Sequence, residues 1–327
     1  MPMSSIRLNF IQPGCEPNEM AARYQAGLDM VELADKSGFT MISLEEHHGA
    51  ENGWSSTPLL LAGLIFGRAK KLTVTLCALL LPLHDPLRVA EDIAVLDLAS
   101  GGRFSFVAGL GYRPSEYAMH RKDWAGRGKL MDECVQALLD AWTGEPFEYH
   151  GEMVRVTPRP FTQPHPMMFI GGSNRVSARR AARFGLPYFP PANLPELETY
   201  YYEQCAERGV EGFCVTSEVA PVMRFVVEDP DKAWAELGQY FLEEAVTYHG
   251  WQTPDITSSV NSKAATVEDL RKEGIYAFVT PDECIAAGKE MGDMGAIMLH
   301  PLCGGMPIDA AWSCMQLYVD KVLPAFS

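Results

Sequence analysis

Phe39-Thr40-Met41-Ile42-Ser43-Leu44-Glu45-Glu46-His47-His48 is the stretch that decides the fold of this chain. Its apolar first part, residues 40–44, has the length of a buried strand, and four ionisable side chains follow it directly. Where strands alternate with helices, chemistry is usually located at the carboxyl ends of the strands. Two imidazoles beside two carboxylates can accept or deliver a proton near neutral pH. Two surface histidines on a solvated loop fit the same stretch equally well.

The alternation of a short apolar strand with a longer helical pattern continues along the chain. Eight strand candidates with helices between them favour a (β/α)8 TIM barrel of the α/β class over an open sheet. We find no domain boundary, so residues 1–327 are expected to form a single domain. The predicted strands cover residues 6–11, 40–44, 72–81, 104–108, 167–170, 219–227 and 296–300, with a short strand near Tyr188. The predicted helices cover residues 18–37, 57–68, 86–100, 126–142, 175–184, 195–208, 230–249 and 309–322, with Asn18 and Asp85 as N-caps.

Two segments interrupt this alternation. Residues 144–166 are rich in proline, aromatic and β-branched residues, which predicts a hairpin-like insertion. Residues 250–265 are polar and show no periodicity, which predicts a lid or a mobile loop.

The composition argues against several classes of protein. The 327-residue chain is 47% hydrophobic and carries a net charge of -15, which disfavours nucleic acid and anionic membrane surfaces as partners. No apolar run approaches the roughly 18 residues of a membrane span, and the first residues lack the pattern of a signal peptide. The eight cysteines show no close pair at metal or redox spacing, which fits reduced thiols. We therefore expect a cytoplasmic protein that acts on a small molecule.

A second candidate feature is the turn Gly171-Gly172-Ser173-Asn174, which follows a predicted strand and opens a predicted helix. Such a turn presents free backbone amides and the positive end of the helix dipole to an anion, and Ser177 can add a hydroxyl. This favours a phosphate site, although an ordinary strand–helix turn with a polar cap has the same sequence features. The turn Cys303-Gly304-Gly305 after the last strand is a competing location.

A metal site is the weaker interpretation of the histidine pair. His47 and His48 are adjacent, so their side chains are expected to diverge rather than share one ion. His84 and Asp85 follow the third strand and could join them, but neither an HxH nor an HExxH pattern is present. We predict no metal ligand, and keep a metal-dependent hydrolase as a remote alternative.

Several motifs in order along the chain resemble the bacterial luciferase-like flavin monooxygenases. The likeness covers roughly residues 6–190 and returns near residues 280–284 and in the last helix. The motifs that carry it are Leu44-Glu45-Glu46-His47-His48, Leu79-Leu80-Leu81-Pro82, Asp85-Pro86, Glu91-Asp92, Leu96-Asp97, Gly102-Arg103-Phe104, Phe184-Gly185-Leu186-Pro187 and Thr280-Pro281-Asp282-Glu283-Cys284.

The resemblance implies a (β/α)8 barrel with insertions that binds reduced FMN at the carboxyl ends of its strands. The flavin would react with O2 to a C4a-peroxyflavin, which would oxygenate a small organic substrate. Because no dinucleotide fingerprint is present, we expect a separate flavin reductase to supply the reduced FMN. The resemblance also implies a homodimer formed through the helices near residues 57–68 and 86–99.

The resemblance further implies roles for individual residues. His47 matches the catalytic base that stabilises the peroxyflavin, and Cys77-Ala78 matches a cis peptide beneath the flavin ring. Ser173, Asn174 and Ser177, with Arg127, match the phosphate site. The remaining residues expected at the cofactor are Phe10, Glu46, Gly109, Gly171 and Gly172.

Two further functions stay open beside the monooxygenase. Relatives of this family use a reduced deazaflavin for hydride transfer without oxygen. Other relatives bind a flavin without catalysis, although they tend to lose parts of the barrel.

Overall fold

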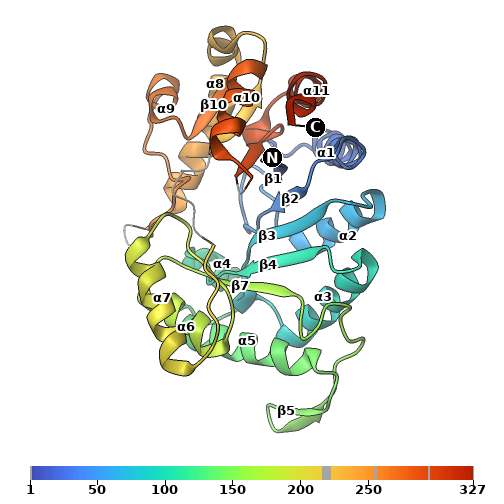
Figure 1. Cartoon of the computed structure of the whole chain (residues 1–327), viewed down its shortest axis with the longest axis vertical. Helices are drawn as coiled ribbons and strands as arrows, with labels where there is room; N and C mark the ends of the chain where they lie inside the picture. The colour runs from blue at the N-terminus through green and yellow to red at the C-terminus, as the bar shows by residue number, and fades with distance from the viewer. Residues whose placement is uncertain (1, 216–221, 254–255, 294, 327) are drawn as a thin grey trace.

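Nine strands form one parallel sheet within residues 2–215, 222–253, 256–293 and 295–326, which the computed structural model describes (Figure 1). These strands are β1 (Met3–Leu8), β2 (Met41–Leu44), β3 (Thr73–Leu79), β4 (Phe104–Ala108), β7 (Met167–Gly171), β8 (Tyr188–Phe189), β9 (Met223–Val226), β10 (Tyr276–Val279) and β11 (Ala296–Leu299).

The strand order is β10-β9-β11-β1-β2-β3-β4-β7-β8. When β10 is left out, eight strands remain, and β1 to β4, β7, β8, β9 and β11 are the first to eighth strands of a barrel in chain order. Their order in the sheet runs from the seventh strand, β9, through the eighth and first to the sixth, β8. The predicted α/β barrel is therefore confirmed. The sequence analysis does not predict β10, which pairs with the free side of β9 from Tyr276 opposite Met223 to Val279 opposite Val226. Within the described residues the ladder ends at β8 and β10.

The helices lie around the outside of the strands (Figure 1). Proline at the first position and glycine after the last residue define many of them, because proline lacks the amide that a first turn leaves unpaired and glycine adopts the left-handed cap. The helices are α1 (Pro17–Ser37), α2 (Pro58–Arg68), α3 (Pro86–Ser100), α4 (Pro114–Met119), α5 (Arg127–Trp142), α6 (Arg175–Phe184), α7 (Pro195–Arg208), α8 (Pro230–Trp251), α9 (Val267–Glu273), α10 (Pro281–Met291) and α11 (Ile308–Leu317). None of the described helices is both long and apolar enough to cross a membrane.

Several predicted boundaries are wrong. β1 covers residues 3–8 rather than 6–11, because the backbone at Phe10 has a positive φ of 57° and leaves the extended conformation. Helix α1 begins at Pro17, with Glu16 rather than Asn18 at the cap position. Helix α11 ends at Leu317, and the rest of the predicted helix, Tyr318–Val322, is a wider π-helical turn. Part of the predicted strand 219–227 lies outside the described residues, and α4, α9 and α10 are not predicted.

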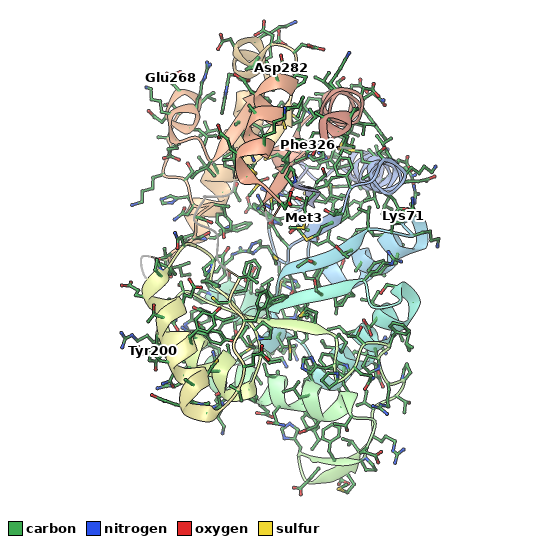
Figure 2. All side chains as sticks on the ribbon, in the orientation of Figure 1. Met3, Lys71, Tyr200, Glu268, Asp282 and Phe326 are labelled. Atoms are coloured by element: carbon green, nitrogen blue, oxygen red, sulfur yellow. The ribbon has the colours of Figure 1, made fainter. Side chains whose placement is uncertain are left out.

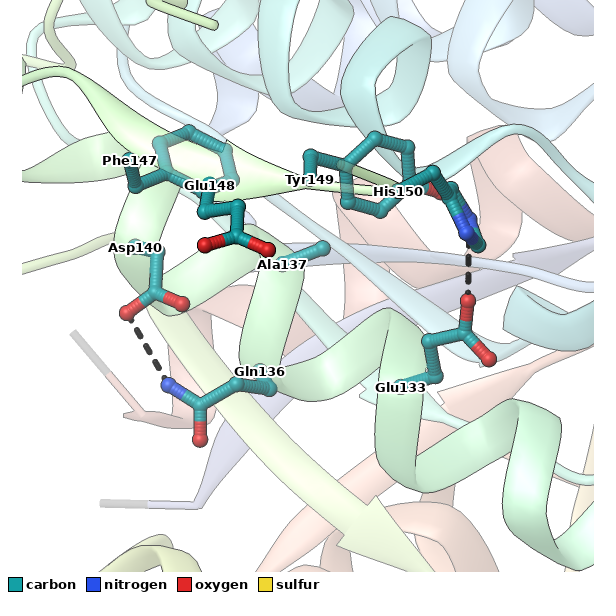
Figure 3. Close-up of a pocket in the computed structure, with 8 residues that line it drawn as sticks. All are labelled: Glu133, Gln136, Ala137, Asp140, Phe147, Glu148, Tyr149 and His150. Carbon is teal, nitrogen blue, oxygen red and sulfur yellow. Dashed lines mark hydrogen bonds and ion pairs between the residues drawn. The ribbon is translucent and has the colours of Figure 1, made fainter. Parts of the chain in front are cut away.

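The predicted cap at Asp85 is confirmed, since its carboxylate accepts hydrogen bonds from the amides of Leu87 and Arg88. The predicted insertion is also confirmed as a hairpin, with β5 (Phe147–Tyr149) antiparallel to β6 (Glu152–Val154). A groove lies between this hairpin and α5, where Glu133 pairs with His150 at 3.0 Å (Figure 3).

A buried ionic cluster occupies the inside of the barrel. Glu244 of α8 pairs with Arg7 at 3.0 Å and with the His300 imidazole at 2.9 Å, and it accepts a hydrogen bond from Asn9 at 2.7 Å. Burial would raise the pKa of Glu244, but His300 and Arg7 outweigh burial and hold the pKa well below the ordinary value. A bond from Arg7 also ties Glu45 to this cluster.

The Glu244 cluster predicts a pH-dependent contribution to stability. A lowered folded-state pKa means that this contribution is present above the ordinary pKa of 4.5 and is lost as the pH falls below it. Glu244→Gln should therefore reduce the free energy of unfolding by about 3–5 kcal/mol at neutral pH, since it leaves buried positive charge uncompensated. The difference from the native protein should shrink in acid.

Urea unfolding from pH 7 to pH 3 measures this difference. The exposed Glu148→Gln on the hairpin is the matched control and should change little at any pH. A Glu244→Gln penalty that is the same at every pH would contradict an ionised Glu244.

Candidate functional site

The two adjacent histidines separate after β2, as the sequence predicts. His47 is 7% exposed, and its Nδ1 lies 3.3 Å from Oε1 of Glu116. Its Nε2 lies 3.4 Å from the hydroxyl of Tyr112. Burial raises the pKa of Tyr112 well above its ordinary value, so this hydroxyl keeps its proton and can donate it to Nε2. The arrangement fits an imidazole with its proton on Nδ1.

His48 belongs to a different set of contacts. Its Nε2 lies 2.8 Å from Oε1 of Glu46, and Nε2 of His84 lies 2.6 Å from the same oxygen. The Leu80 amide donates to the other oxygen at 2.6 Å. Burial would raise the pKa of Glu46, but the bonds from His48 and His84 lower it to about 2. Glu46 is therefore an ionised carboxylate at neutral pH.

Glu116, on α4, contacts His47 and is not among the residues that the sequence predicts for the site. Its Oε1 accepts the His48 amide at 3.0 Å and the Arg113 guanidinium at 3.0 Å, in addition to facing His47. Burial would raise the pKa of Glu116, and the bonds from His47, the His48 amide and Arg113 lower it below the ordinary value. Helix α4 has only six residues, which is too short for a periodic pattern to reveal it.

An aromatic cluster, defined here as Trp54, Tyr112, Tyr248 and Trp251, surrounds His47. The ring centroids of Trp251 and Trp54 lie 4.8 and 5.2 Å from that of His47. Tyr112 and Tyr248 lie at 5.8 and 6.3 Å. Trp251 is the last residue of α8, so this helix extends into the segment 250–265 that is predicted as a lid. Residues 254–255 of that segment lie outside the described residues.

Buried polar atoms without a hydrogen-bond partner occur on the segments that carry this cluster. In the described structure they include the side-chain amide of Asn52 and the hydroxyl of Ser55, on either side of Trp54, and the side-chain amide of Gln252, which follows Trp251. Buried polar groups are normally paired, so these are groups that a bound polar ligand could satisfy.

The predicted cis peptide is present between Cys77 and Ala78. Gly109 lies against it, because a Cβ on Gly109 would come within 2.7 Å of the Ala78 side chain. The backbone there leaves room only for glycine. Burial raises the pKa of the Cys77 thiol to about 12, so the sulfur stays neutral.

The predicted phosphate turn lies at the end of β7. Asn174 and Ser177 form a reciprocal capping box at the start of α6. Gly172 has a φ of 143°, and a Cβ there would come within 2.6 Å of Ser177. Gly171 and Ser173 complete the turn. Arg175 is on the same helix, and its Cζ lies 4.8 Å from the ring centroid of Tyr200. Tyr200 is on α7 and is labelled in Figure 2.

Arg127 opens α5, and its Nε is buried with no hydrogen-bond partner among the described residues. The competing turn at Cys303–Gly305 is excluded as a phosphate site. It is fully buried, and a Cβ on Gly304 would collide with the backbone of Tyr240.

Phe10 is fully buried, and its ring stacks on Tyr24 of α1 with 4.4 Å between centroids. A Cβ on Gly27 of the same helix would meet this ring. The described contacts of Phe10 are thus with α1, and its predicted position beside a flavin stays a prediction.

The model of the luciferase-like monooxygenase family matches residues 3–296. The uncharacterized protein y4wF of Sinorhizobium fredii is 33% identical over 173 residues, 51% of each chain. The alkanal monooxygenase beta chain of Vibrio harveyi is 28% identical over 233 residues, 67% of this chain and 70% of that one. The FMNH2-dependent dimethylsulfone monooxygenase of Pseudomonas putida is 28% identical over 179 residues, 51% of this chain and 48% of that one. The chain thus spans about half the length of two of these relatives.

Solved structures share the fold. The monooxygenase RslO1 of Streptomyces bottropensis superposes with a TM-score of 0.76 at 24% identity, covering 99% of this chain and 100% of that one. The oxygenating constituent of 3,6-diketocamphane monooxygenase of Pseudomonas putida, in complex with FMN, superposes with a TM-score of 0.69 at 19% identity. The match covers 99% of this chain and 98% of that one. An F420-dependent secondary alcohol dehydrogenase superposes with a TM-score of 0.69 at 16% identity, and the match covers 100% of both chains.

The aromatic cluster predicts that Trp251 shields His47. In the native protein, diethylpyrocarbonate should modify His47 slowly, because its ring is almost fully covered. Trp251→Ala removes the ring centred nearest to His47 in the aromatic cluster and should raise the rate of modification several-fold. Peptide mass spectrometry measures the rate at each histidine. His150, whose side chain is 65% exposed, is the internal control and should react equally in both proteins. An unchanged rate at His47 would show that Trp251 does not cover it.

Proposed function

This chain belongs to the luciferase-like monooxygenase family, and from that premise we propose that it is a flavin-dependent monooxygenase. It uses reduced FMN and O2 to oxygenate a small organic substrate. The observation that carries the proposal is His47, an imidazole held between a buried carboxylate and a tyrosine hydroxyl inside an aromatic cluster. A proton-handling group shielded from water is what oxygenation by a reactive flavin species requires.

The residues present fit an FMN. The buried, unpartnered Nε of Arg127 offers a charged donor for a phosphate. The N-terminus of α6, with Gly171 and Gly172 before it, offers backbone amides and the positive end of a helix dipole. Ala78 and Gly109 place two small residues against each other at the cis peptide. These groups, with Ser173, would hold the cofactor.

Bound reduced flavin would supply the electrons that activate O2. The chain's own residues would control protons and water around that reaction. His47 can accept a proton from the substrate at Nε2, and Glu116 stabilises the resulting imidazolium from the Nδ1 side. The rings of Trp54 and Trp251 exclude water from this imidazole. Glu46 is engaged by His48 and His84 and would act on the cofactor only through its charge.

Hydride transfer from a reduced deazaflavin is the second candidate function. It is favoured by the structural likeness to an F420-dependent secondary alcohol dehydrogenase. The sequence similarity to an FMNH2-dependent dimethylsulfone monooxygenase favours the FMN proposal, and with it a separate reductase as the source of reduced flavin.

Anaerobic titration with reduced FMN, followed by air, tests the proposal. Reduced FMN should quench the tryptophan fluorescence of the protein, and air should then allow oxygenation of a member of a substrate library. His47→Ala should leave flavin binding nearly unchanged, because its ring contacts protein groups. It should slow oxygenation by about 10²–10⁴-fold, the usual contribution of a general base.

His150→Ala on the hairpin is the control and should leave both measurements unchanged. Failure to bind reduced FMN would overturn the proposal. Turnover with reduced deazaflavin in the absence of oxygen would establish the second candidate. Tight binding of oxidised flavin without any turnover would indicate a flavin-binding protein.

We also propose a homodimer formed through α2 and α3. Leu60 and Leu64 on α2 are 65% and 46% exposed, and Val95 and Leu98 on α3 are 53% and 44% exposed. Four large apolar side chains on two helices that contact each other form a surface that a second copy of this chain could cover.

Leu64→Glu should convert the dimer to a monomer, because it places a charge in the apolar contact. Light scattering measures the mass of the particle. Met153→Glu, on the hairpin and equally accessible at 69% exposure, is the control and should leave the mass unchanged. A native protein with the mass of one chain would refute the dimer.

A further inference from the structure

Glu46, His48 and His84 form a compact cluster, which we call the Glu46 triad. The proposed monooxygenase chemistry uses neither of its imidazoles and uses Glu46 only through its charge. Oε1 of Glu46 lies 2.8 Å from Nε2 of His48 and 2.6 Å from Nε2 of His84. All three ligand atoms lie within 4.8 Å of one another. The residues come from the end of β2 and from the turn before α3, so the fold rather than local sequence brings them together.

We propose that the Glu46 triad binds a divalent first-row transition-metal ion of the zinc class. Two imidazoles and one carboxylate are a donor set that such ions prefer. Ligand bonds of about 2.0–2.2 Å separate neighbouring ligand atoms by little more than 3 Å, so small side-chain rotations would admit the ion. Each imidazole would then direct its Nε2 lone pair to the metal and carry its proton on Nδ1.

His120 is the independent observation that points to a ligand here. It follows α4, and its ring centroid lies 4.4 Å from that of His48 and 6.5 Å from that of His84. Its Nε2 is buried with no hydrogen-bond partner among the described residues. This buried, unpartnered nitrogen belongs to a ring that packs against His48, and a water held by the ion would satisfy it.

The surrounding charges are compatible with a cation. The Lys122 ammonium and the Arg113 guanidinium are nearby, but they bond to the carbonyl oxygens of His84 and His48 and leave the ligand atoms free. Glu116 adds a second carboxylate on the side of the His48 amide. The His84 side chain is 26% exposed, which gives an ion a way in from solvent.

A second cluster, Glu244 with His300 and Cys303, has similar residue types but does not support the same inference. The His300 and Glu244 side chains are fully buried, and Arg7 and Asn9 already bond to Glu244. A cation there would displace a guanidinium with no route from solvent. The Glu46 triad is reached from solvent at His84, and in the described structure its ligand atoms bond to no cationic Arg or Lys side chain, so it is the better candidate for a metal site.

Metal titration of the flavin-free protein tests the proposal. The protein is stripped with a chelator and exchanged into metal-free buffer. Calorimetric titration with Zn²⁺, together with elemental analysis after desalting, should then give one bound equivalent. Co²⁺ should give the visible absorption of a low-coordinate site, and Zn²⁺ should raise the Tm of the protein.

His84→Ala should weaken Zn²⁺ binding by more than about tenfold, because even the loss of an outer partner of a ligand costs about 10–100-fold. His84→Asn, which keeps a donor toward Glu46, should also lose the ion while preserving the fold. His120→Ala should weaken binding less than His84→Ala. His150→Ala removes a surface histidine paired with Glu133 and is the matched control, with affinity unchanged.

The proposal would be overturned if the native protein bound less than one equivalent of Zn²⁺. It would also be overturned if His84→Asn and His150→Ala bound Zn²⁺ with equal affinity. Unfolding curves establish that each variant is folded. Since no flavin is present, the outcome is independent of the monooxygenase proposal, and either can fail alone.

Discussion

One carboxylate oxygen organises the site. Oε1 of Glu116 faces Nδ1 of His47, accepts the backbone amide of His48 and accepts the Arg113 guanidinium. These donors compensate the cost of burying the charge and hold the pKa of Glu116 below its ordinary value, so the carboxylate is present at neutral pH. The oxygen fixes the backbone at His48 and the ring of His47 together, which is why the two adjacent imidazoles point to different partners. It also connects α4 to the end of β2.

A second constraint positions the aromatic cluster over His47. Glu244, Tyr248 and Trp251 are spaced by four and three residues on α8, so they lie on one face of the helix. The bonds of Arg7, Asn9 and His300 hold Glu244 inside the barrel, and the same helix face then carries the two aromatic rings to the barrel mouth. The Arg113 guanidinium lies over the Trp251 ring, with its Cζ 4.1 Å from the ring centroid, and it also bonds to Glu116. The charged interior and the shielded imidazole are therefore parts of one arrangement.

The sequence predicts those features that depend on local pattern. Strand–helix alternation, the cap at Asp85 and the hairpin at residues 144–166 each follow from periodicity or turn chemistry. The sequence does not predict β10 (Tyr276–Val279), because this ninth strand pairs with the free side of β9, outside the repeat of eight strands that the alternation indicates. Glu116 and Arg113 were missed for a different reason. Their partners His47 and His48 lie more than 60 residues away along the chain, and only the barrel brings them together.

The same distinction between local pattern and tertiary contact applies to the pair His47-His48. A strand end specifies that two neighbouring side chains diverge, but it does not specify what each will meet. In the folded chain each imidazole has its own ionised carboxylate: Glu116 for His47, and Glu46 for His48. Glu46 is shared further with His84 and the Leu80 amide, whereas the far side of the His47 ring meets only a tyrosine hydroxyl and aromatic rings. His47 therefore retains a nitrogen that can exchange a proton with a substrate, while His48 is held in a polar cluster. The assignment of chemistry to His47 follows from this asymmetry of partners, and the pair's sequence alone could not distinguish the two.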